Sequence, residues 1–154
     1  MILNLKELYD QLVLTRQLTM DAVGQVQAVL NSNSEKLIAG RIGNFCDHAT
    51  RHISLQSEGF YRILKAHYHN NSSALKKIDF FENDLKELRV QLFVFVEKYF
   101  SDKPVRNIRA LISGFNEISK DVLNRVDVEN SQLFPLICLH PFNPLIERDQ
   151  SCEI

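Results

Sequence analysis

Apolar residues recur at spacings of three and four along four long stretches of this chain, and this pattern constrains its fold more than any other feature. Such spacing places apolar side chains along one face of an α-helix, where they can pack against neighbouring helices. Clusters of turn-forming residues separate the stretches at positions 31–34, 67–73 and 101–104. No segment alternates with period two for long enough to indicate a strand. The sequence therefore predicts an all-α protein.

The four stretches predict four long helices joined by short loops. Their expected ranges are about 3–30, 35–66, 73–99 and 104–139. Ser34 is a suitable N-cap for the second helix, and Pro104 suits the first turn of the fourth. Short loops make successive helices antiparallel, so residues 1–140 are predicted to form an up-down-up-down antiparallel four-helix bundle. Pro135 is expected to kink or end the fourth helix, which leaves residues 141–154 as a C-terminal tail.

The length, charge and cysteines of the chain limit the number of domains, the kinds of partner and the cellular compartment that we expect for it. Its 154 residues, 45% of them hydrophobic, are enough for one domain with its own core. The formal net charge of −1 provides no field to hold nucleic acid or an anionic membrane, so neither is expected as a partner. No stretch approaches the roughly 20 apolar residues of a membrane span, and the N-terminus has no signal-peptide pattern. Cys46, Cys138 and Cys152 are odd in number and far apart, which favours reduced thiols in the cytoplasm over a disulfide framework.

A few polar residues share the apolar faces of the predicted helices and are therefore expected to point inward. His52 and Gln56 lie on this face of the second helix, and Glu129 lies on that of the fourth, with Arg125 at its border. Arg125 and Glu129 are four residues apart and can form a charge-assisted pair that also satisfies His52 and Gln56. We interpret these four residues as a buried polar cluster with a structural role. The guanidinium would then take the place of a metal cation.

The same region allows a second interpretation, a metal site. Helical bundles commonly hold di-metal centres built from inward carboxylates and histidines. His52 and Glu129 are two such ligands, and His48, four residues before His52, is a third candidate. Two good ligands are too few for a di-iron centre, which takes several from all four helices. The structural interpretation is therefore favoured, and no cofactor is expected.

The chain offers candidates for protein binding but none for catalysis. It contains no Gly-rich phosphate loop, no nucleophile elbow and no HExxH sequence, so an enzyme is not expected. The run Phe-Val-Phe-Val at residues 93–96 is apolar nearly all round its helix, which is typical of deep burial or of contact with a second protein. Phe93 and Val94 are therefore candidate interface residues, for a different protein or for a second copy of this chain.

Two groups of residues, on the second and the fourth predicted helix, carry a family resemblance. They are FC at 45–46, HIS at 52–54 and FYRIL at 60–64, followed by RVDVE at 125–129 and LFPL at 133–136. These segments resemble the hemerythrin-like superfamily of helical bundles, and within it the Rsd/AlgQ family of bacterial anti-sigma regulators. The resemblance covers about residues 40–140 and extends to chain length and helix order. It implies a cytoplasmic, non-enzymatic protein that binds the primary sigma factor of RNA polymerase and alters promoter use.

The resemblance also bears on the metal site. In hemerythrins that bind di-iron, the pair on the second helix resembles His-x-x-x-Glu, whereas here it reads His52 and Gln56. The pair on the fourth helix reads Arg125 and Glu129. This departure implies a dismantled centre and favours the metal-free regulators. A divergent metal or oxygen sensor that uses His52, Glu129 and His48 is the alternative.

The resemblance implies a partner surface on the second helix, and the apolar run at 93–96 extends the expected surface to the third. In such regulators an acidic surface on the second helix meets basic residues of the sigma factor, and here that region carries Asp47, His48 and Arg51. With Phe93 and Val94 on the third helix, these residues make up the expected partner surface.

Overall fold

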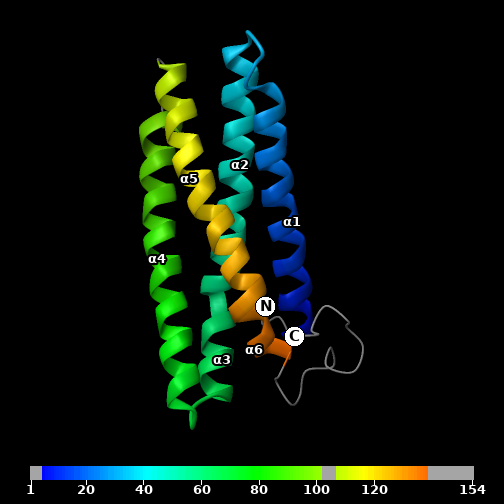
Figure 1. The fold of residues 1–154 in the computed structure, drawn as a ribbon, viewed down its shortest axis with the longest axis vertical. Coiled ribbons are helices and arrows are strands. Elements are labelled where there is room, and N and C mark those ends of the chain that lie inside the picture. The colour runs from blue at the N-terminus through cyan, green and yellow to red at the C-terminus, as the bar shows by residue number, and fades with distance from the viewer. Residues whose placement is uncertain (1–4, 102–106, 139–154) are drawn as a thin grey trace.

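The computed structural model describes residues 5–101 and 107–138, which form helices joined by turns with no strand among them (Figure 1). The helices make four rods that pack side by side along the longest axis. In chain order the rods are α1 (Leu5–Val29); α2 (Glu35–Leu55), continued by the turn η1 (Gln56–Phe60) and α3 (Tyr61–His67); α4 (Ser72–Phe100); and α5 (Ile108–Val128), continued by the turn η2 (Glu129–Leu133) and α6 (Phe134–Cys138). The predicted all-α class is confirmed. None of the described helices is long and apolar enough to cross a membrane.

Serine and asparagine side chains fix where three of the rods begin. The side chains of Ser34, Asn71 and Asn107 each accept a hydrogen bond from the backbone N–H three residues further on. The fourth rod therefore begins at Ile108, and the predicted start near Pro104 is wrong, because Asn107 supplies the cap. Pro104 itself lies outside the described residues.

The second predicted helix is interrupted, which corrects its expected range of 35–66. The backbone leaves the helical conformation at Glu58 (φ −86°, ψ 23°) and Gly59 (φ 135°, ψ −12°), inside η1. A φ of this size lies in the left-handed region that glycine adopts without steric cost. α2 and α3 are therefore two helices joined by a kink at Gly59.

The fourth rod widens just before its last helix. In η2 the backbone N–H of Phe134 donates to the carbonyl of Glu129, five residues back, where a regular α-helix would bond four residues back. Pro135 follows directly, and its ring would clash with the carbonyl four residues before it in a regular helix. The disturbance expected at Pro135 therefore takes the form of a widened turn, after which helix α6 continues to Cys138.

Aliphatic and phenylalanine side chains from all four rods fill the interior. The largest fully buried apolar side chains are Leu12, Ile42, Phe45, Phe60, Leu64, Ile78, Leu85, Leu111, Phe115 and Leu133. Phe45 and Phe115 meet edge to face with ring centroids 5.2 Å apart, which joins α2 to α5. Gly114 lets the Phe95 ring lie against α5, since a Cβ at this position would be only 2.9 Å from that ring. The missing side chain at Gly114 thus sets how closely α4 and α5 pack.

Two of the three cysteines fall within the described residues. Cys46 is a buried free thiol in α2, and Cys138 is the last residue of α6. Cys152 belongs to the predicted tail, residues 141–154, which lies outside the described part of the chain.

Candidate functional site: a buried polar cluster and two surface grooves

His52, Gln56, Arg125 and Glu129 meet in the interior of the bundle, each with 4% or less of its surface exposed. Nε2 of His52 lies 2.9 Å from Oε2 of Glu129, and Nε of Arg125 donates to Oε1 of the same carboxylate at 3.4 Å. The Gln56 amide also donates to Oε1 of Glu129, while the Gln56 oxygen accepts from Arg125 Nη2 at 3.2 Å. The four residues form one hydrogen-bonded group, called the polar cluster below.

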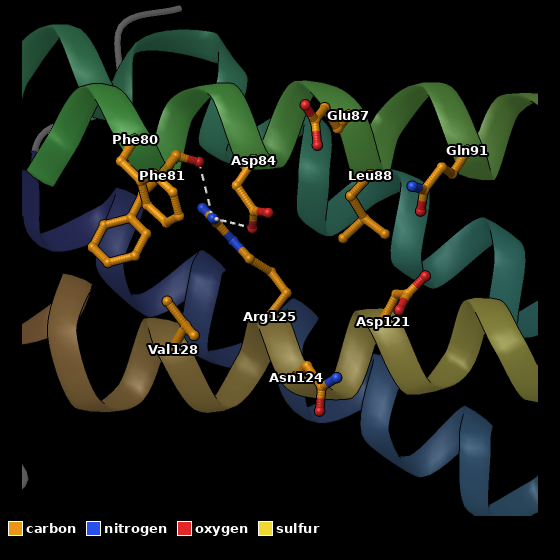
Figure 2. A pocket seen from close by; sticks show the side chains of 10 residues that line it. All are labelled: Phe80, Phe81, Asp84, Glu87, Leu88, Gln91, Asp121, Asn124, Arg125 and Val128. Atoms are coloured by element: carbon orange, nitrogen blue, oxygen red, sulfur yellow. Dashed lines mark hydrogen bonds and ion pairs between the residues drawn. The ribbon is translucent and has the colours of Figure 1, made fainter.

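Arg125 extends the polar cluster to α4 and α3. Its Nη1 donates to the Phe81 carbonyl at 2.9 Å and lies 3.1 Å from Asp84 Oδ2, as the dashed lines in Figure 2 show. Its Nη2 donates to the hydroxyl of Tyr61. A guanidinium presents its N–H donors in a rigid planar fork, so all of these partners must be placed correctly at once. Arg125 therefore holds α5 in a fixed position relative to the second and third rods.

His52 connects the polar cluster to α1. Its Nδ1 lies 2.8 Å from the buried hydroxyl of Thr15, and its Nε2 faces Glu129. Both ring nitrogens are thus engaged, one on each side of the imidazole. With Thr15 and Asp84 included, the hydrogen-bonded side chains come from all four rods.

The polar cluster satisfies its own polar atoms. Among the described residues, Ser32 Oγ is the one buried side-chain polar atom without a hydrogen-bond partner, and it lies outside the cluster. The positive charge of the buried Arg125 guanidinium and the negative charge of the buried Glu129 carboxylate offset each other. Half-exposed Asp84 adds a second negative charge at the edge of the cluster. Removing one partner of a buried ion pair strands the other charge without solvent, which is strongly unfavourable. The geometry is therefore that of a rigid polar layer inside an apolar core.

Burial and neighbouring groups shift the pKa of Glu129, in the polar cluster, and of Tyr61, which Arg125 contacts. Burial alone would raise the pKa of Glu129, but hydrogen bonds and charges from His52, Gln56 and Arg125 outweigh it and hold that pKa below its ordinary value of 4.5. Burial raises the pKa of the Tyr61 hydroxyl above its ordinary value of 10.0, against the opposing effect of Arg125. Glu129 is thus ionised and Tyr61 protonated at neutral pH.

Sequence patterns do not reveal Thr15, Tyr61 and Asp84 as partners of the polar cluster. Thr15 shares the buried face of α1, but a threonine there commonly bonds its own helix, as this one does to the Gln11 carbonyl at 2.9 Å. Tyr61 follows the kink at Gly59, which shifts the helical phase of α3 relative to α2. Asp84 is exposed at the edge of α4 and reaches Arg125 from outside the core. Two features of the sequence could have pointed to these partners: Thr15 lies on an apolar helix face, and Gly59 lies within a predicted helix just before Tyr61.

The alternative metal site is not assembled in the described part of the chain. Within residues 5–101 and 107–138, no three His, Cys, Asp or Glu side chains gather closely enough to hold a metal ion. His48 is half-buried on α2 and does not form such a group with His52 and Glu129. The guanidinium of Arg125 contacts the Glu129 carboxylate instead, as a permanent cation.

The expected partner surface is divided by α4. Phe93 is 64% exposed and lines a groove between α2 and α4, whereas Val94 is 57% exposed and lines a groove between α4 and α5. On α2, Asp47 and Arg51 are exposed and His48 is half-buried. Phe93 and Val94 therefore lie in two different grooves and cannot serve one flat interface.

The α2–α4 groove is mainly apolar and has a volume of about 250 Å³. Ile53 from α2 lines it together with Leu92 and Phe93 from α4. Arg89 and Glu97, one basic and one acidic, lie along its α4 side. Its chemistry is that of an apolar slot with a charged rim.

The α4–α5 groove consists of two hollows that share Gln91 and Asp121 and are therefore continuous. Figure 2 shows the first hollow, with Arg125 crossing it from α5 towards α4. Acidic side chains from both helices line the groove together with the basic Lys98 and Arg125, and apolar Phe80 and Val94 lie along α4. Acidic side chains outnumber basic ones here, whereas the α2–α4 groove has one of each.

Comparisons of this chain with protein-family models, curated proteins and solved structures each found no match. The relation to the hemerythrin-like superfamily and to the Rsd/AlgQ family therefore stays a prediction from the residues quoted above.

Proposed function

We propose that this chain is a cytoplasmic, non-enzymatic transcription regulator of the anti-sigma type, which binds the primary sigma factor of RNA polymerase. In this proposal the fold is an up-down-up-down antiparallel bundle of the hemerythrin-like kind, and the polar cluster stands in place of a di-iron centre. The partner is a protein, and neither nucleic acid nor a membrane is bound directly.

The α2–α4 groove is the observation that carries this proposal. It lies between α2, to which the Rsd/AlgQ resemblance assigns the partner surface, and α4, which carries the candidate interface residue Phe93. Phe93 is 64% exposed beside it, and exposed aromatic side chains next to an apolar slot are typical of protein interfaces. Ile53 and Leu92, both buried, provide the apolar floor against which a partner side chain would pack.

An amphipathic helix of the sigma factor has the chemistry that this groove requires. Its apolar face would cover Phe93 and Val96, in the manner of helix-in-groove recognition. Charged residues on its flanks would pair with Arg89 and Glu97, which adds specificity of orientation. Asp47 lies three residues before Thr50, a lining residue of α2, and extends the charged rim along that helix.

The polar cluster supports a binding role because it makes the scaffold rigid. Its side chains tie all four rods together and leave no cluster atom unpaired. A partner that docks on rods held in this way has less conformational freedom to immobilise on binding. The same pairing gives the cluster a structural explanation that requires no bound metal.

Titration of the purified full chain with purified primary sigma factor tests the proposal, with two matched variants. Phe93 and Phe80 lie on the same helix and are 64% and 65% exposed, but Phe80 lines the α4–α5 groove. Truncating a central aromatic anchor costs about 2 kcal/mol or more, which is roughly a thirtyfold loss of affinity. We expect that loss for Phe93→Ser and near-normal affinity for Phe80→Ser, measured by isothermal titration calorimetry.

Three outcomes would contradict the proposal. One is the absence of binding to the sigma factor, and another is an equal loss of affinity in both variants. The third is stoichiometric iron with a visible absorption band in the same preparation, which would favour the sensor that uses His52, Glu129 and His48. Sedimentation of the free chain separates these outcomes from self-association through Phe93, which would depend on protein concentration.

A further inference from the structure

We propose that the α4–α5 groove is a second docking site, and that its occupant is a basic amphipathic helix of another protein. This proposal does not rest on the sigma-factor proposal, because the groove lies between a different pair of helices. Its shape, its apolar residues and its charge each point to the same class of occupant.

The length of the groove suits a helix. Its two hollows have volumes of about 360 and 540 Å³ and share Gln91 and Asp121. Along α4 the lining extends from Phe80 to Tyr99, which at the rise of an α-helix is roughly 28 Å, or about five turns. A site of this length and openness is matched by a helical segment, whereas a small ligand would fill only one hollow.

Apolar side chains at two points of the groove would receive the apolar face of that helix. Phe80 is 65% exposed and Val94 is 57% exposed, and about four helical turns separate them along α4. Between them, buried Leu88 lines the groove and contributes to its apolar floor. Large apolar groups exposed at this spacing would be covered by an apolar stripe running along the occupant.

The charge of the groove selects a basic occupant. Asp84 and Glu87 line it from α4, and Glu117 and Asp121 line it from α5 (Figure 2 shows Asp84, Glu87 and Asp121). The lining also holds two basic side chains, so four acidic groups face Lys98 and Arg125. The positive charge of Arg125 is already shared between Glu129 and Asp84. In the described parts of the chain, none of Glu87, Glu117 and Asp121 takes part in an ion pair.

These unpaired carboxylates also repel one another. Glu117 and Asp121 are four residues apart on α5, a spacing at which like charges destabilise a helix. Lysine or arginine side chains of an occupant would relieve this repulsion and gain ion pairs along both walls. The same negative charge disfavours nucleic acid and anionic lipid as occupants. It also disfavours the C-terminal residues 147–153 of this chain, which carry three acidic residues against one basic residue.

Fluorescence anisotropy with a designed peptide tests the proposal on the full-length chain. The probe is a labelled amphipathic helix of leucine and lysine, about five turns long, and its counterpart carries glutamate in place of lysine. We expect the lysine peptide to bind with an affinity that falls as salt is added, and the glutamate peptide not to bind. Chemical-shift changes in an NMR titration should fall on residues that line the α4–α5 groove.

Two double variants with the same change in charge make the test specific. Glu87→Gln with Asp121→Asn removes one carboxylate from each wall, and we expect binding of the lysine peptide about fivefold to tenfold weaker. Glu58→Gln with Asp127→Asn removes two exposed carboxylates outside the groove, and we expect no change. All four positions are exposed, so both variants should fold.

The phenylalanine variants separate this proposal from the previous one. Phe80→Ser should weaken binding of the lysine peptide and Phe93→Ser should not, the reverse of their expected effects on the sigma factor. Equal weakening in the two double variants, or binding of the glutamate peptide, would overturn the proposal. Sedimentation could also overturn the proposal. If the wild-type chain self-associates and the variant with Glu87→Gln and Asp121→Asn does not, the occupant of the groove is a second copy of the chain. Failure of the sigma factor to bind would leave these results unchanged.

Discussion

The imidazole of His52 and the carboxylate of Glu129 lie 2.9 Å apart in the interior of the bundle, although 77 positions separate them in the sequence. This contact joins the end of α2 to the beginning of η2, so it exists only when the second and fourth rods are correctly aligned. Each side chain lies on an apolar helix face, but the contact between them depends on how the rods pack. The stability of the protein should therefore respond strongly to changes at this pair.

Replacement of Glu129 should destabilise the protein more than an ordinary surface change. Glu129→Ala leaves the buried guanidinium of Arg125 without its carboxylate, and we expect the free energy of unfolding to fall by about 3 to 5 kcal/mol. Glu129→Gln keeps the shape and part of the hydrogen bonding, so its loss should be smaller. Urea denaturation followed by circular dichroism measures both. An unchanged midpoint for Glu129→Ala would show that the structural role assigned to the polar cluster is wrong.

The same carboxylate should contribute to acid sensitivity. Because the native pKa of Glu129 is held below its ordinary value of 4.5, the native state binds its proton less readily than the unfolded state does. Its stabilising contribution is therefore complete above about pH 4.5 and is lost as the pH falls through the lower native pKa. Unfolding free energies measured over this range should decrease more steeply for the wild type than for Glu129→Gln. Identical slopes in the two proteins would contradict the lowered pKa.

The kink between α2 and α3 should make Gly59 intolerant of a side chain. The nearest atom to a Cβ there would be Nη2 of Arg62 at 3.8 Å, so space is sufficient, but φ is 135°. We expect Gly59→Ala to lower the free energy of unfolding by about 1 to 3 kcal/mol through backbone strain alone. Gly24→Ala is the control, since it lies in α1 with no atom within 4 Å of a Cβ, and it should stabilise by up to about 1 kcal/mol. Stabilisation by both substitutions would mean that residues 35–66 form one continuous helix after all.

The buried thiol of Cys46 should react slowly in the folded protein. Burial, with a smaller contribution from the charge of Asp47, raises the pKa of Cys46 to about 12, so almost none of it is thiolate at neutral pH. We expect alkylation of Cys46 to be much slower in the native state than in urea. Peptide mapping by mass spectrometry distinguishes it from the other two cysteines. Rapid native labelling at Cys46 would show that this part of α2 opens readily.

Helical periodicity could predict the all-α fold class and much of the core, because the residues buried on one face of a helix must recur every three or four positions. Positions such as Ile42, Phe45 and Phe115 follow from that spacing and are buried. The starts of helices were less predictable, because Pro104 and Asn107 are both acceptable at a helix start and only the actual cap bond decides between them. The break at Gly59 was missed because a single glycine inside an amphipathic pattern only modestly weakens a helix.

The candidate site could be predicted in part, for a related reason. Polar residues on an apolar face are few, so His52 and Glu129 stand out without knowledge of the packing. Asp84 and Tyr61 could not be found in this way, because one lies at the edge of α4 and the other follows the kink. The sequence also could not show that Phe93 and Val94 lie in two different grooves. Adjacent residues on a helix point about 100° apart, and which groove each one lines depends on where the neighbouring rods pack.

The polar cluster has a consequence for how the bundle assembles. Its hydrogen bonds reach every rod, so a folding intermediate that lacks one rod must keep Arg125 and Glu129 hydrated or leave a buried group unpaired. A rod that slipped by one turn, about 5.4 Å, would bring Arg125 against apolar side chains and separate it from the Phe81 carbonyl. Compact but misaligned arrangements, which a purely apolar interior would tolerate, are thereby penalised. The chain is therefore expected to reach its native alignment in a single cooperative step, with few partly docked species along the way.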